Sequence, residues 1–306
     1  MTQLPAYLVW LYCIYIFIGS VMEQNKPCYQ YKKRVYTDGL LNGAIDATYI
    51  IHLNDNGREP DIEKQLSAYR PTDIVYIVIN KGYKTCPKNL PDQTPPHDLT
   101  DAFLQIFQHA NKENYNHILI LEDDFLFHPN IKDPAIQRDI CEFLETKNTN
   151  NCMYYLGCLP YIQSTGFSNH NRLYLSSGTH ACIYSKPLRD YIRESYTQSD
   201  IIDWDLFHNC NSFQYPRYIY SQPLCYQLFP PTENSKHWYN PLGLADIIKY
   251  LHQQFDLNKQ VEPGHQFFYG VSKFIYVFVL FVIACFIAFI LKWLVTPGRG
   301  VQKQRK

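Results

Sequence analysis

Short apolar segments alternate with amphipathic ones through the middle of the chain. Residues 47–53 (ATYIIHL), 73–80 (DIVYIVIN) and 117–121 (HILIL) have the length and the β-branched content of strands. Between them, apolar residues recur at helical spacing in 60–69 and again in 99–110. This alternation is typical of βαβ units, so the pattern predicts an α/β domain with parallel strands.

The pattern continues after the third predicted strand. An apolar stripe over 136–144 predicts another helix, and 153–157 and 181–184 predict further strands. Ser185 and Asp98 each precede a helical pattern and are residue types that cap helices. The sequence therefore predicts one α/β domain over residues 45–260.

An apolar segment lies near the carboxyl end of the chain. Residues 274–291 (FIYVFVLFVIACFIAFIL) form an 18-residue run without a charge, between Lys273 and Lys292. At 1.5 Å per residue this helix is about 27 Å long, close to the ~30 Å hydrocarbon core of a bilayer. We predict a transmembrane helix over 271–295, followed by a basic cytosolic tail over 296–306.

The amino-terminal segment has two interpretations. Residues 1–22 carry no charged side chain and contain an apolar run that suits either a signal peptide or an uncleaved anchor. Residues 23–44 are then predicted to be a stem. If the basic tail is cytosolic, the positive-inside rule places the folded domain in a lumen or outside the cell.

Charge and cysteine content narrow the class of protein. The chain has 28 Lys and Arg against 28 Asp and Glu, and it has no long basic run, which argues against a nucleic-acid-binding protein. The paired short spacings of structural zinc sites are absent, so the cysteines of the middle region favour disulfides or buried thiols. These cysteines are Cys28, Cys86, Cys141, Cys152, Cys158, Cys182, Cys210 and Cys225. Their pairing does not follow from the sequence.

Three consecutive acids, Glu122, Asp123 and Asp124, follow the strand predicted over 117–121. Open α/β sheets bind ligands beyond the carboxyl ends of their strands. Glu122 and Asp124, one residue apart on an extended chain, point to the same side. Carboxylate oxygens at such an edge suit Mg²⁺ or Mn²⁺ that also contacts substrate phosphates. The alternative is a solvated turn, and the pattern alone leaves both interpretations open.

Four segments, in order, resemble glycosyltransferase family 25 and its GT-A-fold relatives, which include glycosyltransferase-like proteins of large DNA viruses. HILILEDDFLF resembles the ILEDD signature of the family, and YIIHLNDNGRE resembles its first strand. GTHACIYSKPLRDYI and IIDWDLF resemble two later segments. His52 stands where the family usually has Asn. The resemblance spans about residues 45–240 and implies a GT-A (Rossmann-like) domain that binds a nucleotide sugar.

The resemblance also implies an activity and a set of partners. A sugar would pass from a nucleotide-diphosphate donor, expected to be a UDP-sugar, to a hydroxyl of a glycan or protein acceptor, with inversion at the anomeric carbon. The expected metal ligands are Glu122, Asp124 and His237, and the expected donor contacts are Asn54, Asp55, Arg58 and Asp123. Asp203 is the first choice for the general base and Asp205 the second.

These assignments have structural alternatives. Asn54 and Asp55 belong to an Asn-Asp-Asn-Gly run, which is a strong turn sequence, and Asp203 is suited to cap a helix. A protein of a different class, an inactive transferase-like fold that acts as a membrane or envelope interaction protein, also fits the sequence. That interpretation is favoured if the three acids point away from any pocket or are held by a neighbouring Lys or Arg.

Overall fold

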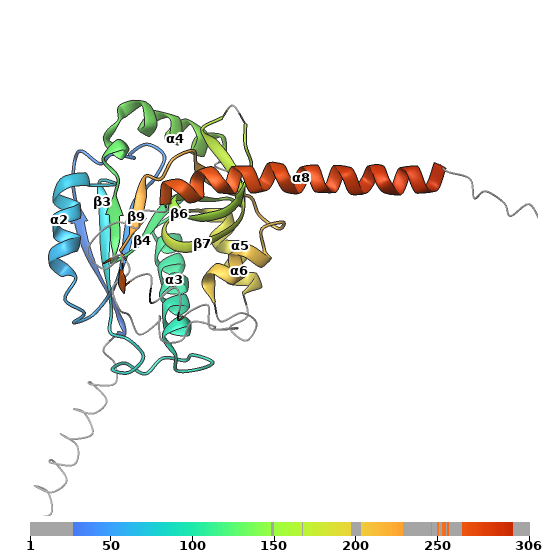
Figure 1. Ribbon diagram of the computed structural model, residues 1–306. Coiled ribbons are helices and arrows are strands. Elements are labelled where there is room, and N and C mark those ends of the chain that lie inside the picture. The colour runs from blue at the N-terminus through green and yellow to red at the C-terminus, as the bar shows by residue number, and fades with distance from the viewer. Residues whose placement is uncertain are drawn as a thin grey trace, which may run out of the picture.

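The apolar segments of the middle region form a mixed seven-stranded sheet with the order β1-β3-β2-β4-β7-β6-β8. The computed structural model describes residues 27–147, 150–166, 168–196, 203–228 and 265–295, with residues 246, 250, 253, 254 and 256. Figure 1 shows an α/β domain from which the long helix α8 projects. The predictions for residues 1–22, for His237 and for the tail over 296–306 lie outside the described residues.

The strands of the large sheet run in both directions. β2 pairs in parallel with β3 and with β4, whereas β1 and β7 pair antiparallel to this trio at its two sides. A smaller sheet is formed by two short antiparallel strands, β5 and β9. The strands are β1 (Tyr29–Val35), β2 (Ala47–Leu53), β3 (Ile74–Asn80), β4 (His117–Glu122), β5 (Phe125–Phe127), β6 (Met153–Gln163), β7 (His170–Ser185), β8 (Arg217–Tyr220) and β9 (Cys225–Gln227).

Helices cover both faces of the sheet. On one face, Phe103 and Phe107 of α3 share an apolar cluster with Tyr49 of β2, together with residues of α5 and α6. On the other face, residues of α2 and α4 join the neighbouring β2 residue Ile50. Because successive strand residues point to opposite faces and both faces are covered, β2 is buried from Ala47 to His52 and is mostly apolar. The helices are α2 (Glu59–Tyr69), α3 (Pro95–Lys112), the 3-10 helix η1 (Pro129–Lys132), α4 (Pro134–Thr146), α5 (Lys186–Ser195), α6 (Trp204–Cys210) and α8 (His265–Val295).

Most predicted elements are present, and the differences have physical reasons. The Ser185 hydroxyl accepts a hydrogen bond from the Leu188 amide, which confirms the predicted cap of α5. The prediction for Asp98 is wrong, because α3 begins at Pro95 and Asp98 lies inside it. Asp98 is buried and accepts hydrogen bonds from Lys88 and Asn80, so its carboxylate serves a buried polar network instead of a helix end.

The segment 23–44, predicted to be a stem, contains the strand β1. β1 pairs with β3 at the edge of the large sheet, so the sheet begins at Tyr29. Lys32, Lys33 and Arg34 lie in this strand, and charged residues are common on edge strands, where they oppose pairing with other chains. Such a strand lacks a clear apolar alternation, which is why the hydropathy pattern does not reveal it.

The helix α8 has two parts. Its first turns pack on β6, where the Gln163 side chain donates hydrogen bonds to the Tyr269 carbonyl at 3.1 Å and to the Ser272 hydroxyl at 2.8 Å. The ring of Tyr276 stacks on that of Tyr174 at a centroid distance of 5.5 Å. From Gln266 to Lys292 the helix is long and apolar enough to cross a membrane, and none of its most apolar window is buried.

One disulfide joins two of the predicted cysteines. Cys28, just before β1, is bonded to Cys86, in the loop after β3, and this cross-link closes a segment with a sequence separation of 58. The other cysteines of the described residues are free thiols: Cys141, Cys152, Cys158, Cys182, Cys210, Cys225 and Cys285. The disulfide therefore fastens the edge strand β1 and the loop after β3 to each other.

We expect loss of this cross-link to destabilise the domain. The double variant Cys28→Ser/Cys86→Ser should lose about 2–4 kcal/mol of unfolding free energy, because the unfolded chain regains the freedom of the closed loop. The measurement is a denaturant titration of the full chain with and without dithiothreitol. Reduction should shift the midpoint of the wild type and of the control Cys141→Ser but leave the double variant unchanged; an unchanged wild type would contradict the prediction.

Candidate functional site

The candidate site lies at the carboxyl ends of the parallel strands β2 and β4. Ile51 of β2 stands opposite Glu122 of β4 in the sheet register, so the loop after β2 meets the acids that follow β4. This loop contains Asp55 and Gly57 with φ angles of +61° and +76°, and it leads directly into α2. The topology therefore brings the two acidic and polar segments identified in the sequence to one edge of the sheet.

Asp123 is the centre of a hydrogen-bond network. Its side chain is buried and forms an ion pair with the Nη1 group of Arg58. It also accepts hydrogen bonds from His52 Nδ1 at 3.0 Å and from Asn56 Nδ2 at 2.6 Å, and more weakly from the Leu53 amide at 3.4 Å. Burial alone would raise the pKa of Asp123, but these donors outweigh it and lower that pKa.

His52 belongs to the same network. Its Nδ1 faces Asp123 and its Nε2 faces Glu59 at 2.9 Å, so both ring nitrogens act as donors. Burial alone would lower the pKa of His52, but its bonds and charge interactions with the two carboxylates outweigh burial and raise that pKa. The network therefore joins the buried His52 and Asp123 to the exposed Glu59, and it fixes the loop after β2 against β4.

The environments of Glu122 and Asp124 raise their pKa values, whereas that of Asp123 lowers its pKa. Burial, followed by the charges of nearby acids, raises the pKa of Glu122 well above its usual range, and its Oε1 accepts a hydrogen bond from the Thr179 hydroxyl at 3.3 Å. Burial and the charge of Asp123 raise the pKa of Asp124 to about 7. Asp124 accepts hydrogen bonds from Gln227 Nε2 at 3.2 and 3.3 Å, and Arg58 Nη1 lies 3.7 Å away.

Asp205 joins this group from a distant part of the sequence. It lies in the first turn of α6, and its charge is among those that raise the pKa of Glu122. Its Oδ2 accepts a hydrogen bond from the Gly178 amide at 2.8 Å. Gly178 has a φ of +88°, a conformation that residues with a side chain rarely adopt, so the bend that presents this amide favours glycine. Burial raises the pKa of Asp205 to about 7.

The other predicted residues have mainly structural positions. Asp203, the first choice for the general base, is the N-cap of α6: its exposed carboxylate accepts a hydrogen bond from the Leu206 amide at 2.8 Å. Asn54 and Asp55 are exposed residues of the turn after β2, and Asn54 donates a hydrogen bond to Asp55. Arg58 contacts Asp123 and Asp124, so a phosphate contact would have to share its guanidinium.

Two of the three predicted metal ligands, Glu122 and Asp124, belong to the described residue ranges. Across these ranges, no group of three or more His, Cys, Asp or Glu side chains is arranged to hold a metal ion. The third predicted ligand, His237, lies outside them. Glu122 and Asp124 offer the oxygen donors that Mg²⁺ and Mn²⁺ prefer, and Mg²⁺ sites in which substrate phosphates take part often have only one or two carboxylates.

Several partners in the site were not identified from the sequence. His52 is a polar residue inside an apolar strand, and this signal marks it as unusual. Asn56 was considered only as part of a turn, although its side chain binds Asp123. Thr179 and Gln227 carry no such signal, because their contacts with Glu122 and Asp124 depend on the antiparallel pairing of β7 with β4 and of β9 with β5.

Comparisons with known proteins give limited guidance. No family model matches the chain, and no curated protein matches it. One similar solved structure is a glycosyltransferase involved in the glycosylation of the major capsid of PBCV-1, with a TM-score of 0.37 and 10% identity, covering 62% of this chain and 95% of that one. Another is a protein from STIV, with a TM-score of 0.35 and 12% identity, covering 61% of this chain and 86% of that one. At these scores the likenesses carry no argument about function.

We expect Asp205→Asn to stabilise the protein in a pH-dependent way. A raised pKa means that the folded state favours the protonated acid, so the wild type is most stable below the usual pKa of Asp and loses stability as the pH rises towards 7. The neutral isostere avoids this loss. The gain should be small at pH 4 and reach about 3 kcal/mol at pH 8. The measurement is denaturant unfolding of the full chain at both pH values; a gain that does not grow with pH would contradict the assignment.

Asp123→Asn should have the opposite effect. Because the pKa of Asp123 is lowered in the folded protein, its ionised form adds stability at neutral pH, and this contribution is lost as the pH falls through the lowered pKa. The variant should therefore lose about 2–4 kcal/mol at pH 7, since it leaves Arg58 and His52 without their anionic partner. The same unfolding measurement applies, and a neutral or stabilising result at pH 7 would show that the network does not hold the site together.

Proposed function

We propose that this chain is a membrane-anchored glycosyltransferase that moves a sugar from a nucleotide-diphosphate donor to an acceptor hydroxyl. The observation that carries the proposal is the convergence of Glu122, Asp124 and Asp205 at the carboxyl ends of the parallel strands. Groups with strongly shifted pKa values gather at functional sites, and this edge of an α/β sheet is where ligands bind. The resemblance of the segments around these acids to GT-A enzymes of family 25 suggests the reaction.

The charge distribution supports a polar, anionic ligand that brings its own cation. Asp123 takes the closer ion pair with Arg58, whose Nη1 lies 3.7 Å from Asp124, whereas the hydrogen bonds to Glu122 and Asp124 come from the uncharged side chains of Thr179 and Gln227. In the proposed site these two carboxylates would hold Mn²⁺ or Mg²⁺, which would neutralise charge on the diphosphate leaving group. Hydroxyl groups of a sugar are also suitable donors to such carboxylates.

Asp205 is the residue that we propose as the general base. Its pKa of about 7 matches the range in which a carboxylate accepts a proton most effectively at neutral pH. The carboxylate takes the proton of the acceptor hydroxyl while the hydroxyl oxygen forms a bond to the anomeric carbon. The bond from that carbon to the diphosphate oxygen breaks, and the nucleotide leaves with the electron pair. Attack from the opposite face inverts the configuration. Asp203 remains the helix cap.

Two features support a membrane-anchored domain outside the cytosol. The exposed apolar surface of α8 is much longer than a water-soluble protein usually leaves uncovered. The Cys28–Cys86 disulfide is typical of an oxidising compartment. We therefore propose that α8 crosses the membrane and that the acceptor hydroxyl belongs to a glycan or protein in a lumen or at the cell surface. A UDP-sugar is the donor class that we propose.

The experiment is a donor screen with the full chain in detergent. UDP-sugars are supplied with an acceptor mixture, and release of UDP is measured with Mn²⁺, with Mg²⁺ and after chelation. Asp205→Asn should lower turnover about 10²–10⁴-fold, the usual contribution of a general base. Glu122→Gln and Asp124→Asn should raise the Mn²⁺ concentration needed for half-maximal turnover.

Asp203→Asn is the matched control, because Asn is also a good N-cap and the helix α6 should remain intact. It should keep most of the wild-type turnover. Equal losses in Asp203→Asn and Asp205→Asn would contradict the assignment of the base. Turnover that Glu122→Gln and Asp124→Asn leave unchanged would contradict the role of the two carboxylates.

A second candidate is an inactive transferase-like protein that acts through binding. The observation that favours it is the ion pair of Asp123 with Arg58, since the central acid and the basic residue expected to bind phosphate occupy each other. Calorimetry with UDP and Mn²⁺ measures binding, and the donor screen measures turnover. An active transferase shows both, whereas the inactive protein shows no turnover with any donor in the screen.

A further inference from the structure

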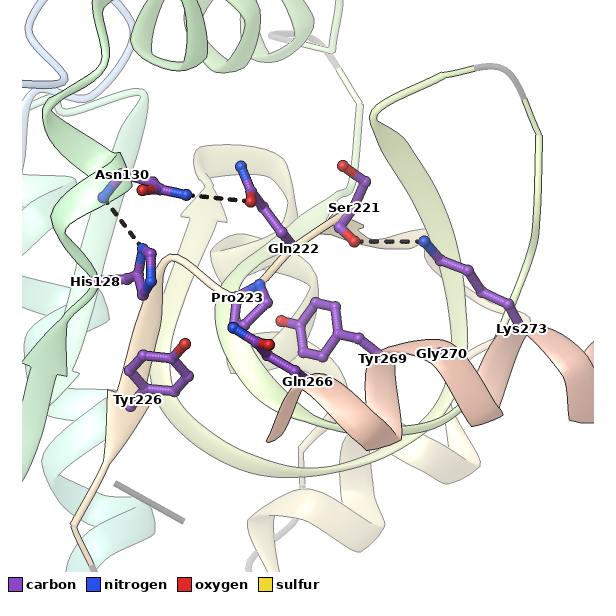
Figure 2. A pocket seen from close by; sticks show the side chains of 10 residues that line it. All are labelled: His128, Asn130, Ser221, Gln222, Pro223, Tyr226, Gln266, Tyr269, Gly270 and Lys273. Atoms are coloured by element: carbon purple, nitrogen blue, oxygen red, sulfur yellow. Dashed lines mark hydrogen bonds between the residues drawn. The ribbon is translucent and has the colours of Figure 1, made fainter. Parts of the chain in front are cut away.

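A cavity lies where α8 meets the domain. It has a volume of about 350 Å³, and Figure 2 shows it between the start of α8, the segment after β5 and the loop between β8 and β9. None of the acids of the candidate site lines it. Its lining consists of His128, Asn130, Ser221, Gln222, Pro223, Tyr226, Gln266, Tyr269, Gly270 and Lys273. No carboxylate is present among these residues.

One face of α8 forms a wall of the cavity. Gln266, Tyr269, Gly270 and Lys273 follow the spacing of neighbouring positions on a helix, so they line one stripe. Across from them, the Asn130 side chain donates a hydrogen bond to Gln222 at 3.2 Å, which orders the opposite wall. In Figure 2 the Lys273 side chain of α8 reaches the Ser221 carbonyl in the loop between β8 and β9.

The buried hydroxyl of Tyr269 lacks a hydrogen-bond acceptor among the described residues. Tyr269 is 4% exposed, and the Cys158 backbone approaches its buried oxygen as a hydrogen-bond donor, but no acceptor for the hydroxyl proton is present among the described residues. A buried hydroxyl without a partner costs free energy, and native proteins usually satisfy such groups with another residue, water or a ligand. Tyr269 lines the cavity, so a ligand there would lie beside the residue that carries this hydroxyl.

Lys273 provides the positive charge of the cavity. Its Nζ group donates a hydrogen bond to the Ser221 carbonyl at 3.4 Å, and no ion pair joins Lys273 to an acid within the described ranges. An ammonium group has three donors, so it can bind an anionic oxygen while it keeps the contact with Ser221. The amides of Asn130, Gln222 and Gln266 add donors and acceptors suited to hydroxyl groups.

The position of the cavity along α8 indicates where an anionic ligand would come from. Lys273 immediately precedes the uncharged run over 274–291, so its side chain would lie at the boundary between hydrocarbon and headgroups if α8 spans a bilayer. Tyr161 and Tyr174 contact α8 through Phe268 and Tyr276, at the same end of the run. Tyrosines are enriched at this level of membrane proteins.

We propose that this cavity binds the headgroup of an anionic phospholipid that carries a polyol, such as phosphatidylglycerol or phosphatidylinositol. The phosphate lies against Lys273 and Tyr269, and the polyol hydroxyls lie against the side-chain amides. The acyl chains run beside the exposed apolar part of α8. This proposal rests on the membrane anchoring in the proposed function but needs no transferase activity.

The experiment uses the full chain in detergent and native mass spectrometry to count bound lipid. With phosphatidylglycerol, we expect one retained lipid per chain and weaker retention of phosphatidylcholine at equal concentration. Tyr269→Phe and Lys273→Gln should each lower the affinity for phosphatidylglycerol about tenfold, as expected for one lost hydrogen bond to a charged group. Tyr269→Phe should lower the unfolding midpoint little, because no acceptor among the described residues binds the hydroxyl proton.

Lys292→Gln is the matched control, since it removes the same charge from the other end of the apolar run. It should leave retention unchanged. Equal losses in Lys292→Gln and Lys273→Gln, or equal retention of phosphatidylcholine, would overturn the proposal by showing general attraction to the helix. Flotation of the chain with neutral phosphatidylcholine liposomes tests the anchoring separately. A chain that floats but has no preference for phosphatidylglycerol refutes this inference alone, whereas a chain that does not float refutes the membrane anchoring as well.

Discussion

The ion pair between Asp123 and Arg58 is the interaction on which the candidate site depends. Two consecutive acids, Asp123 and Asp124, are largely withdrawn from water at the end of β4, and buried carboxylates are stable only with donors or cations beside them. Arg58 lies at the N-cap of α2, directly after the turn that follows β2. The pair therefore joins the ends of two neighbouring strands and determines the path of the loop between β2 and α2.

The same pair explains why the three acids differ. Asp123 takes the guanidinium, His52 and Asn56, and its pKa falls, whereas the pKa of Asp124 rises beside it. The three adjacent carboxylates thus divide into one structural anion and two acids whose negative charges are poorly compensated by the protein. Such a division is consistent with a ligand that supplies positive charge or hydrogen-bond donors to these two acids. It also separates the Asp123 position, which the fold itself needs, from positions that remain available for chemistry.

The sequence predicted those parts of the molecule in which local pattern and tertiary structure agree. The strand over 47–53 and the helix begun by Ser185 follow from hydropathy and capping alone. The apolar stripe of α3 begins at Leu99, which favours Asp98 as the helix cap. The helix in fact starts earlier, at Pro95 after Thr94, and the stripe does not mark this start. The strand β1 was missed because its charged residues reflect an edge position, and an edge exists only once the sheet is assembled.

In the site, too, the sequence identifies only those residues that a local pattern marks. The acids after β4 were visible because three charges in a row after an apolar strand are unusual. The proposed preference for Asp205 over Asp203 as the general base does not follow from the sequence, since it rests on which carboxylate faces Gly178 across the fold. Their separation follows from the start of α6: the N-cap residue turns its side chain back to the helix amides, and the residue two positions later is turned elsewhere.

The cavity beside α8 and the carboxylate site share one structural support. β5 and β9 form a short antiparallel pair, and Tyr226 of β9 lines the cavity while its neighbour Gln227 holds Asp124. The same pair connects Asp124 to His128 along β5. Tyr226 and Gln227 are adjacent residues of β9 and cannot shift independently. A displacement of Tyr226 in the cavity would therefore also displace Gln227, which binds the Asp124 carboxylate. The helix that is apolar enough to cross a membrane thus faces, across the cavity, the strand whose next residue binds Asp124 of the candidate site.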